Sequence, residues 1–187
     1  MVKKRLSGGG SFAPLEAFST DFTQLNYRNG KAHLMAVVCI ETRYVAGWAV
    51  GRRANRKLAL RCWKRVKERL AELGTEPARC IVHHDQDSVY TSHDWLRKLL
   101  ARGTKRRSAT PKTAQKTTRG SSRSGAAPET ENESLIAEAE STTGLTEIVS
   151  DGFDYYNSGR RHSALQYEPP LTYLRHRIER EDISREP

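Results

Sequence analysis

The sequence predicts an α/β protein in which a mixed β-sheet is covered by helices. Three stretches near the start, 17–25, 32–40 and 44–52, have strand-like compositions and follow one another closely. A segment with helical spacing then separates them from a fourth strand-like stretch, 79–84. Short turns join antiparallel strands, whereas a helical connection allows parallel pairing. The order strand-strand-strand-helix-strand-helix therefore predicts an antiparallel three-stranded meander extended by parallel strands.

The first three strands are predicted from composition and turns. Residues 17–25, AFSTDFTQL, mix β-branched and aromatic side chains. Asn29-Gly30 follows, the dipeptide that a type I′ hairpin turn favours at its centre. The nearly continuous apolar run AHLMAVVCI (32–40) is typical of a strand buried on both faces. After a short turn, 44–52 completes the meander.

The central part of the chain changes its hydrophobic period. Apolar residues in 55–74 recur mostly at three- and four-residue steps, which predicts a helix with one apolar face that ends at Gly74. The short apolar stretch 79–84 is the fourth strand. Residues 91–102 start with a capping residue and predict a second helix.

Helical spacing returns over 132–158, with a break expected around Gly144. Residues 168–182 predict a last short helix with proline near its start. We therefore divide the chain into a flexible N-terminus (1–15), a core (16–175) and a C-terminal tail (176–187).

The net charge of +10 over 187 residues suggests a polyanionic partner, most simply nucleic acid. Most of this charge lies in 101–128, which has no acid and eight basic residues: Arg102, Lys105, Arg106, Arg107, Lys112, Lys116, Arg119 and Arg123. Without them the chain would carry only +2. No large apolar residue occurs between Leu100 and Leu135. We expect 101–130 to be disordered, since it lacks the side chains that offset ordering entropy.

Other compositional signals favour an intracellular protein that does not enter a membrane. No apolar run approaches the ~20 residues that a membrane span needs, and the basic N-terminus lacks the apolar stretch of a signal peptide. The odd set of Cys39, Cys62 and Cys80 occurs in apolar contexts. These cysteines are expected as reduced core residues, and the protein as cytoplasmic.

Two aspartates stand out as candidate site residues. Asp21 lies in the middle of a strand, where an acid is costly unless it is paired, exposed or bound to a cation. Asp85 follows the fourth strand, at the carboxyl end where ligands of α/β sheets gather. The alternatives are an edge-strand acid facing water and an ordinary loop acid. His83 and His84 point to opposite faces of a strand and so do not easily serve one ion.

Three motifs resemble those of insertion-sequence transposases with a retroviral-integrase-like catalytic core. STDFTQ is similar to the first acidic motif and VHHDQDSVYTS to the second. The closing YYNSGRRHSALQYEPPLTYL is similar to the tail of these transposases. His84, Asp87 and Val89 depart from the residues usual in the second motif.

The resemblance implies an RNase H-like fold and a site in which two Asp and one Glu hold two Mg²⁺ or Mn²⁺ ions for phosphodiester hydrolysis and strand transfer in DNA integration. Asp21 and Asp85 match the first two acids. The implied partner is DNA, at the transposon ends and the target, with a possible homo-oligomer and nucleoid association. Arg160, Arg161 and His162 match the tail and could approach DNA; otherwise they complement the end of a helix.

The third acid is not where the resemblance implies it. In this family it follows the second Asp after about 35 residues and precedes the tail Tyr by about 34. Counted from Asp85 and from Tyr156, the two spacings meet at Ser121-Ser122. The spacing between Asp85 and Tyr156 is kept, but the expected Glu is absent. Two compensating frameshifts that bound about 104–130 would give this result.

Other interpretations stay open. Glu133 could be the third acid, or the basic stretch could be a DNA-binding arm. We also expect that no helix-turn-helix module fits before Ala17, which would make the product truncated. The sequence thus favours a degenerate, inactive transposase core over a non-enzymatic nucleic-acid-binding protein.

Overall fold

The computed structural model describes residues 12–75, 80–84, 105–108 and 132–183. It contains a five-stranded sheet in the order β3-β2-β1-β4-β5. The strands are β1 (Ala17–Tyr27), β2 (Gly30–Cys39), β3 (Val45–Gly51), β4 (Ile81–His84) and β5 (Lys105–Ser108). β1, β2 and β3 pair antiparallel, whereas β4 pairs parallel with both β1 and β5. The predicted α/β mixed sheet is confirmed.

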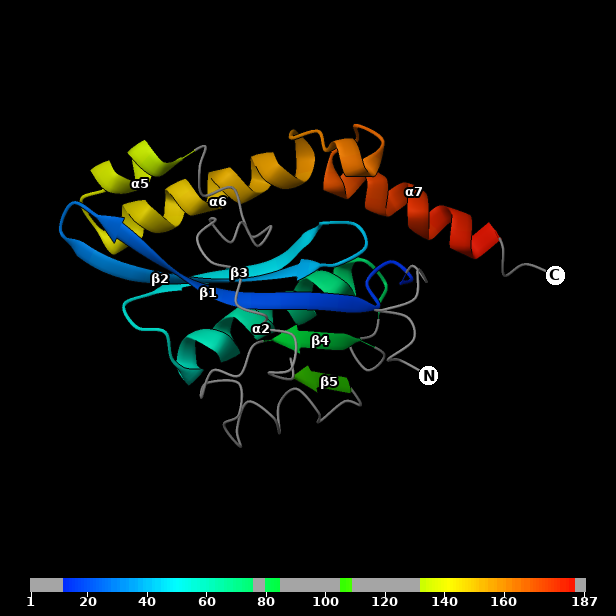
Figure 1. The fold of residues 1–187 in the computed structure, drawn as a ribbon, viewed down its shortest axis with the longest axis horizontal. Helices are drawn as coiled ribbons and strands as arrows, with labels where there is room; N and C mark the ends of the chain where they lie inside the picture. The colour runs from blue at the N-terminus through cyan, green and yellow to red at the C-terminus, as the bar shows by residue number, and fades with distance from the viewer. Residues whose placement is uncertain (1–11, 76–79, 85–104, 109–131, 184–187) are drawn as a thin grey trace, which may run out of the picture.

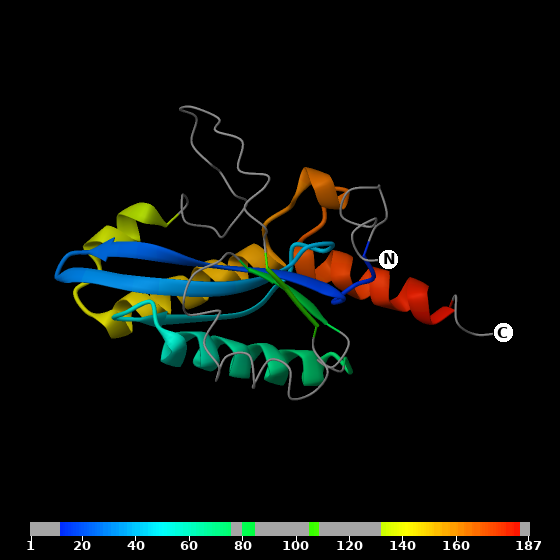
Figure 2. The same ribbon diagram turned by 60° about the horizontal axis from the view of Figure 1, so that its bottom comes forward.

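Helices cover both faces of the sheet (Figures 1 and 2). Helix α2 (Arg56–Glu72) lies on one face, and α5 (Glu133–Glu138) and α6 (Thr142–Ser158) lie on the other. A short 3₁₀ helix, η3 (Ser163–Leu165), leads from α6 into α7 (Pro170–Ile183), which crosses the predicted boundary between core and tail at residue 176.

The apolar run in β2 supplies two separate cores, as the sequence predicts. Met35, Val37 and Cys39 belong to the core beneath α2. Ala32, Leu34 and Val38 belong to the core beneath α5 and α6. Because successive side chains of a strand alternate between faces, one apolar stretch fills both layers.

Helix α2 is held by caps at both ends. The Asn55 side chain accepts a hydrogen bond from the Leu58 N–H at 3.0 Å. At the other end, the Gly74 N–H donates to Ala71 O and the Thr75 N–H donates to Leu70 O. Gly74 has a φ of +68°, so the helix ends in a Schellman motif with glycine in its left-handed position. The predicted end at Gly74 is confirmed.

The hairpin turn differs from the prediction. Tyr27 pairs with Gly30, which leaves Arg28 and Asn29 as the two turn residues. Neither is among the described residues with positive φ, whereas a type I′ turn requires positive φ at both. Gly30, at φ +147°, begins β2 instead. The predicted type I′ turn centred on Asn29-Gly30 is therefore wrong.

Two further expectations need correction. The break in 132–158 falls at 139–141, before Gly144, because the Ser141 side chain accepts the Gly144 N–H at 3.0 Å and begins α6 there. Residues 105–108 form β5 within the stretch expected to lack structure, because backbone pairing with β4 orders them without apolar side chains. The predicted helix 91–102 lies outside the described residues.

Candidate active site

Asp21 lies in the middle of β1, the central strand of the sheet. It pairs with Ala36 of β2 and its side chain is exposed. Its Oδ1 accepts a hydrogen bond from the Phe22 N–H at 2.8 Å. Phe18 and Phe22 pack into the core beneath α2, so Asp21 faces the opposite side of the sheet. The fold thus presents an exposed carboxylate on the central strand of the sheet.

β4 runs parallel to β1 and brings the first residues of the second acidic motif beside the first motif. Ser19 of β1 pairs with His83 of β4, and His84 is the last residue of the strand. His84 is buried, whereas His83 is half-buried. Asp85 follows His84 in the chain and lies outside the described residues.

Glu133 is the exposed first residue of α5. This helix packs through Ile136 and Ala139 into the cluster that contains Leu25 of β1. Leu25 lies four residues beyond Asp21, about 13 Å along an extended strand. Ser121 and Ser122 lie outside the described residues. In the described part of the chain, no group of three or more His, Cys, Asp or Glu side chains could hold a metal ion.

The three candidate DNA-binding residues of the tail, Arg160, Arg161 and His162, differ in whether they pack on the protein or are exposed. The Arg160 guanidinium carbon lies 5.9 Å from the centre of the Tyr156 ring. The His162 ring meets the same tyrosine edge-on, with centroids 4.9 Å apart. Burial raises the pKa of Tyr156, so its hydroxyl stays neutral. Arg161 is exposed. Only Arg161 is therefore turned outward, while its neighbours pack on a buried aromatic ring.

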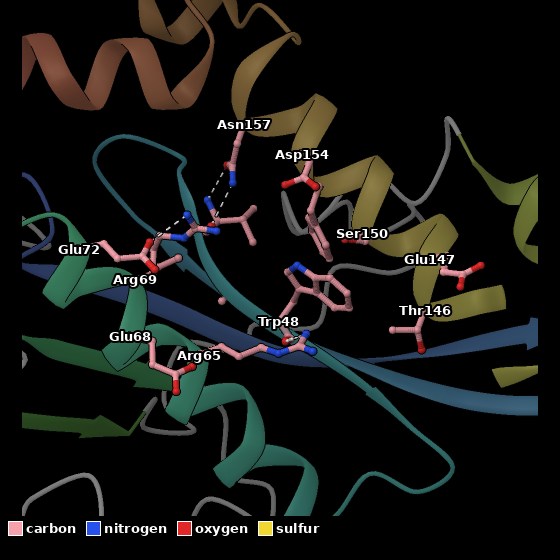
Figure 3. A pocket seen from close by; sticks show the side chains of 14 residues that line it. Trp48, Arg65, Glu68, Arg69, Glu72, Thr146, Glu147, Ser150, Asp154 and Asn157 are labelled. Atoms are coloured by element: carbon pink, nitrogen blue, oxygen red, sulfur yellow. Dashed lines mark hydrogen bonds and ion pairs between the residues drawn. The ribbon is translucent and has the colours of Figure 1, made fainter. Parts of the chain in front are cut away.

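A pocket of about 470 Å³ lies at the other edge of the sheet, between α2, β3 and α6 (Figure 3). Trp48 stands inside it, stacks on Phe153 and carries the Arg65 guanidinium 4.7 Å from its ring centre. β3 is two strands away from β1, so this pocket is not at Asp21. Sequence reasoning did not find it, because its walls come from segments about a hundred residues apart.

Side chains from both helices also cover the backbone of β3. Asn157 of α6 accepts the Val45 N–H at 3.0 Å and donates to Val45 O at 3.1 Å (Figure 3). From α2, Arg65 donates to Trp48 O at 3.0 Å and Arg61 donates to Val50 O. Asn157 belongs to the tail motif, so one part of that motif has a structural role at the sheet edge.

A mixed five-stranded sheet with helices on both faces and an exposed carboxylate on its central strand is the arrangement of an integrase-type, RNase H-like core. Residues 13–114 match the family described as Integrase core domain (rve). The chain belongs to this family.

The chain is also similar to individual proteins. It is 27% identical over 172 residues to the transposase for insertion sequence element IS904 of Lactococcus lactis subsp. lactis (strain IL1403). This similarity covers 86% of the chain but 62% of that transposase, so the chain spans less than two thirds of this curated relative.

Two solved structures show the same fold at low identity. The HTLV-2 integrase catalytic core domain in complex with magnesium (trimeric form) superposes with a TM-score of 0.63 at 11% identity, covering 88% of this chain and 99% of that one. A chain of the simian T-cell lymphotropic virus intasome in complex with PP2A regulatory subunit B56 gamma gives 0.61 at 13% identity, covering 88% and 55%.

Among the helices that the structure describes, none combines the length and apolar character of a membrane span.

Proposed function

We propose that the chain is the catalytic core of a DNA transposase in which Asp21 and Asp85 hold a divalent metal ion and the third acid has been lost. Its substrates are the DNA ends of an insertion element and a target DNA. The proposal rests on membership of the integrase core family and on the strand register around Asp21.

The register of β1 and β4 is the observation that carries the proposal. The parallel pairing joins Ala17 to Ile81, Phe18 to Val82 and Ser19 to His83. Asp21 and Asp85 each follow the last of these pairs by two residues. Neighbouring strands lie about 4.8 Å apart, so a site shared by the two carboxylates needs only that the same register continue.

The donor chemistry of Asp21 fits a hard divalent cation. Mg²⁺ and Mn²⁺ prefer carboxylate oxygens, and the Asp21 carboxylate is exposed on the sheet with one oxygen fixed by the Phe22 N–H. Asp21 and Asp85 would be the residues that hold the ion. Two such ions, when bound, supply charge stabilisation to the attacking and leaving oxygens of a phosphodiester.

The third ligand distinguishes an active core from a degenerate one. The family match ends at residue 114, before Ser121-Ser122 where the spacing predicts a Glu. A serine hydroxyl cannot supply the missing negative charge. Both the match and β5 extend past residue 104. We therefore place the start of the frameshifted stretch between residues 109 and 120. The sequence alone places it at about residue 104.

Metal titration tests the site. We expect isothermal titration calorimetry with Mn²⁺ to show one weak site in the unaltered chain. A hard divalent cation keeps most of its water ligands when only two carboxylates bind it. Asp21→Asn and Asp85→Asn should each abolish it. Asp154→Asn removes an exposed carboxylate at the β3 pocket and should leave it intact. Identical isotherms for all four proteins would mean that the aspartate pair is not a site.

A plasmid assay tests the loss of activity and the role of Glu133. With supercoiled DNA and Mn²⁺, we expect no nicking above background, since a metal-site ligand must be held within about 0.5 Å by a packed shell. Nicking that disappears in Glu133→Gln would instead make Glu133 the third acid. The alternative function, a non-enzymatic DNA-binding protein, predicts DNA binding without any Mn²⁺ site.

A further inference from the structure

The segment that follows α6 forms a tight turn closed by backbone hydrogen bonds. His162 and Glu168 form an isolated antiparallel bridge. The Tyr167 N–H donates to His162 O at 2.9 Å, and the Glu168 N–H donates to Leu165 O at 3.0 Å. Leu165 is buried and anchors the turn from within. Residues 162–168, which we name the tail turn, are thus fixed at both ends and in the middle.

Two consecutive residues of the tail turn have left-handed backbones although neither is glycine. Gln166 has a φ of 57° and Tyr167 a φ of 62°. This conformation is unfavourable for side chains with a Cβ and persists only where the surroundings enforce it. Its result is that the Tyr167 side chain projects into solvent with 70% of its surface exposed. A large aromatic ring is therefore held in water on a rigid support.

The residues that precede this ring in the chain are basic. Between Gly159 and Tyr167 there are two arginines and one histidine and no acid. Arg161 is exposed, whereas Arg160 and His162 pack on Tyr156. The next residue is Glu168. Its carboxylate is hydrogen-bonded to His176 Nδ1 at 3.1 Å. An exposed aromatic ring on the tail turn and an exposed guanidinium just before that turn supply the stacking face and the positive charge that bind single-stranded nucleic acid.

We propose that Tyr167 is a stacking platform for an unpaired DNA base and that Arg161 binds a neighbouring phosphate. Every base has a π face, so such a platform accepts any sequence, but a base inside a duplex is already stacked on its neighbours. The tail turn therefore prefers frayed or single-stranded DNA over intact duplex. This inference rests on the proposed function, because it assigns part of the binding of the DNA that the core acts on to the tail turn.

Fluorescence anisotropy with the full chain tests the platform. Labelled single-stranded DNA and the matched duplex are titrated in EDTA, which removes metal binding from the measurement. Tyr167→Gly deletes the ring and suits the left-handed backbone. We expect it to weaken single-strand binding about 5- to 100-fold, the range for loss of one stacked base, and duplex binding by less than about twofold. Tyr167→Phe keeps the ring and should bind within about twofold.

Gln166→Gly is the matched control, because it relieves the same backbone strain and leaves the ring in place. It should keep single-strand affinity. Thermal unfolding should show both glycine variants at least as stable as the parent, which separates loss of binding from loss of fold. Single-strand binding by Tyr167→Gly equal to that of the parent would overturn the proposal. Because Mn²⁺ titration measures the aspartate pair separately, either proposal can fail while the other holds.

Discussion

At the scale of single residues, Gly47 shows how tightly α2 lies on the sheet. A Cβ at this position of β3 would lie 2.6 Å from Val66 Cγ2 and 2.9 Å from the Val66 backbone nitrogen. The valine side chain could rotate, but the backbone of a helix packed on the sheet cannot move without its neighbours. Gly47 thus sets the distance between helix and strand.

We predict that Gly47→Ala lowers the free energy of unfolding by about 1–3 kcal/mol, the usual cost of overpacking a core. Gly144→Ala is the control, since its Cβ would meet only Ser141 Oγ at 3.6 Å. That variant should be neutral or more stable by up to about 1 kcal/mol, because alanine favours a helix. Urea unfolding measures both; equal effects would show that the contact at Gly47 is not limiting.

At the scale of elements, α2 depends on its N-terminal cap. Asn55 has an extended backbone, and its side chain satisfies the Leu58 N–H. The first turn contains no acidic residue to interact favourably with the helix dipole, so the cap acts without that help.

Asn55→Ala should therefore cost about 1 kcal/mol of stability, within the range for lost caps. Asn55→Ser keeps a capping oxygen and should cost much less. The shift in urea midpoint distinguishes them, provided the slope of unfolding free energy against urea is unchanged. A serine variant as unstable as the alanine variant would mean that the asparagine contributes through something other than capping.

Element types were predictable from the sequence wherever side-chain patterns decide them. The nearly continuous apolar run 32–40 identified a strand buried on both faces, and Gly74 marked the end of α2. The hairpin turn was mispredicted because the register, not the turn dipeptide, decides which residues are paired. β5 was missed because backbone pairing with β4 forms it, and this pairing leaves no apolar pattern in its sequence.

The candidate site was predictable only in part. Asp21 was singled out because an acid inside a strand is costly unless it is paired, exposed or bound to a cation. The structure shows it exposed on the central strand, and its role as a metal ligand stays a prediction. The pocket around Trp48 and the tail turn could not be predicted in this way. Both depend on contacts between distant segments or on backbone angles, and neither leaves a periodic pattern in the sequence.

At the scale of the whole molecule, buried thiols and phenols make the fold sensitive to alkaline pH. Burial raises the pKa of Cys80 from its ordinary 9.0 to about 12. It also raises the pKa values of Cys62, Tyr44 and Tyr156. All three cysteines are free and buried, as expected from the sequence.

Because these folded-state pKa values lie above the unfolded ones, the contribution of these groups to stability is fully present below about pH 9 and is lost as the pH rises towards 12. Ionisation of Cys62 and of Cys80 in the unfolded chain should each lower the free energy of unfolding by about 1 kcal/mol at pH 10. Urea midpoints at pH 8 and pH 10 test this, and Cys80→Ala should reduce the difference. An unchanged midpoint in the parent would contradict it.

The history of the whole chain makes a prediction about its coding DNA. If two compensating frameshifts removed the third acid, one alternative frame across about codons 109–130 should encode a segment with a Glu-Ser motif near codon 121 or 122. Translating the other two frames is the measurement. The absence of such a motif from both frames would leave the serine pair without this explanation.

The Asn157 amide bears on whether other chains can add to the edge of the sheet. By offering one donor and one acceptor to Val45, it imitates a single residue of a neighbouring strand. Arg65 and Arg61 occupy two more carbonyls along β3. An uncovered sheet edge is a template on which other chains add and form aggregates. We therefore expect side chains from the two helices to hinder the addition of another strand along β3.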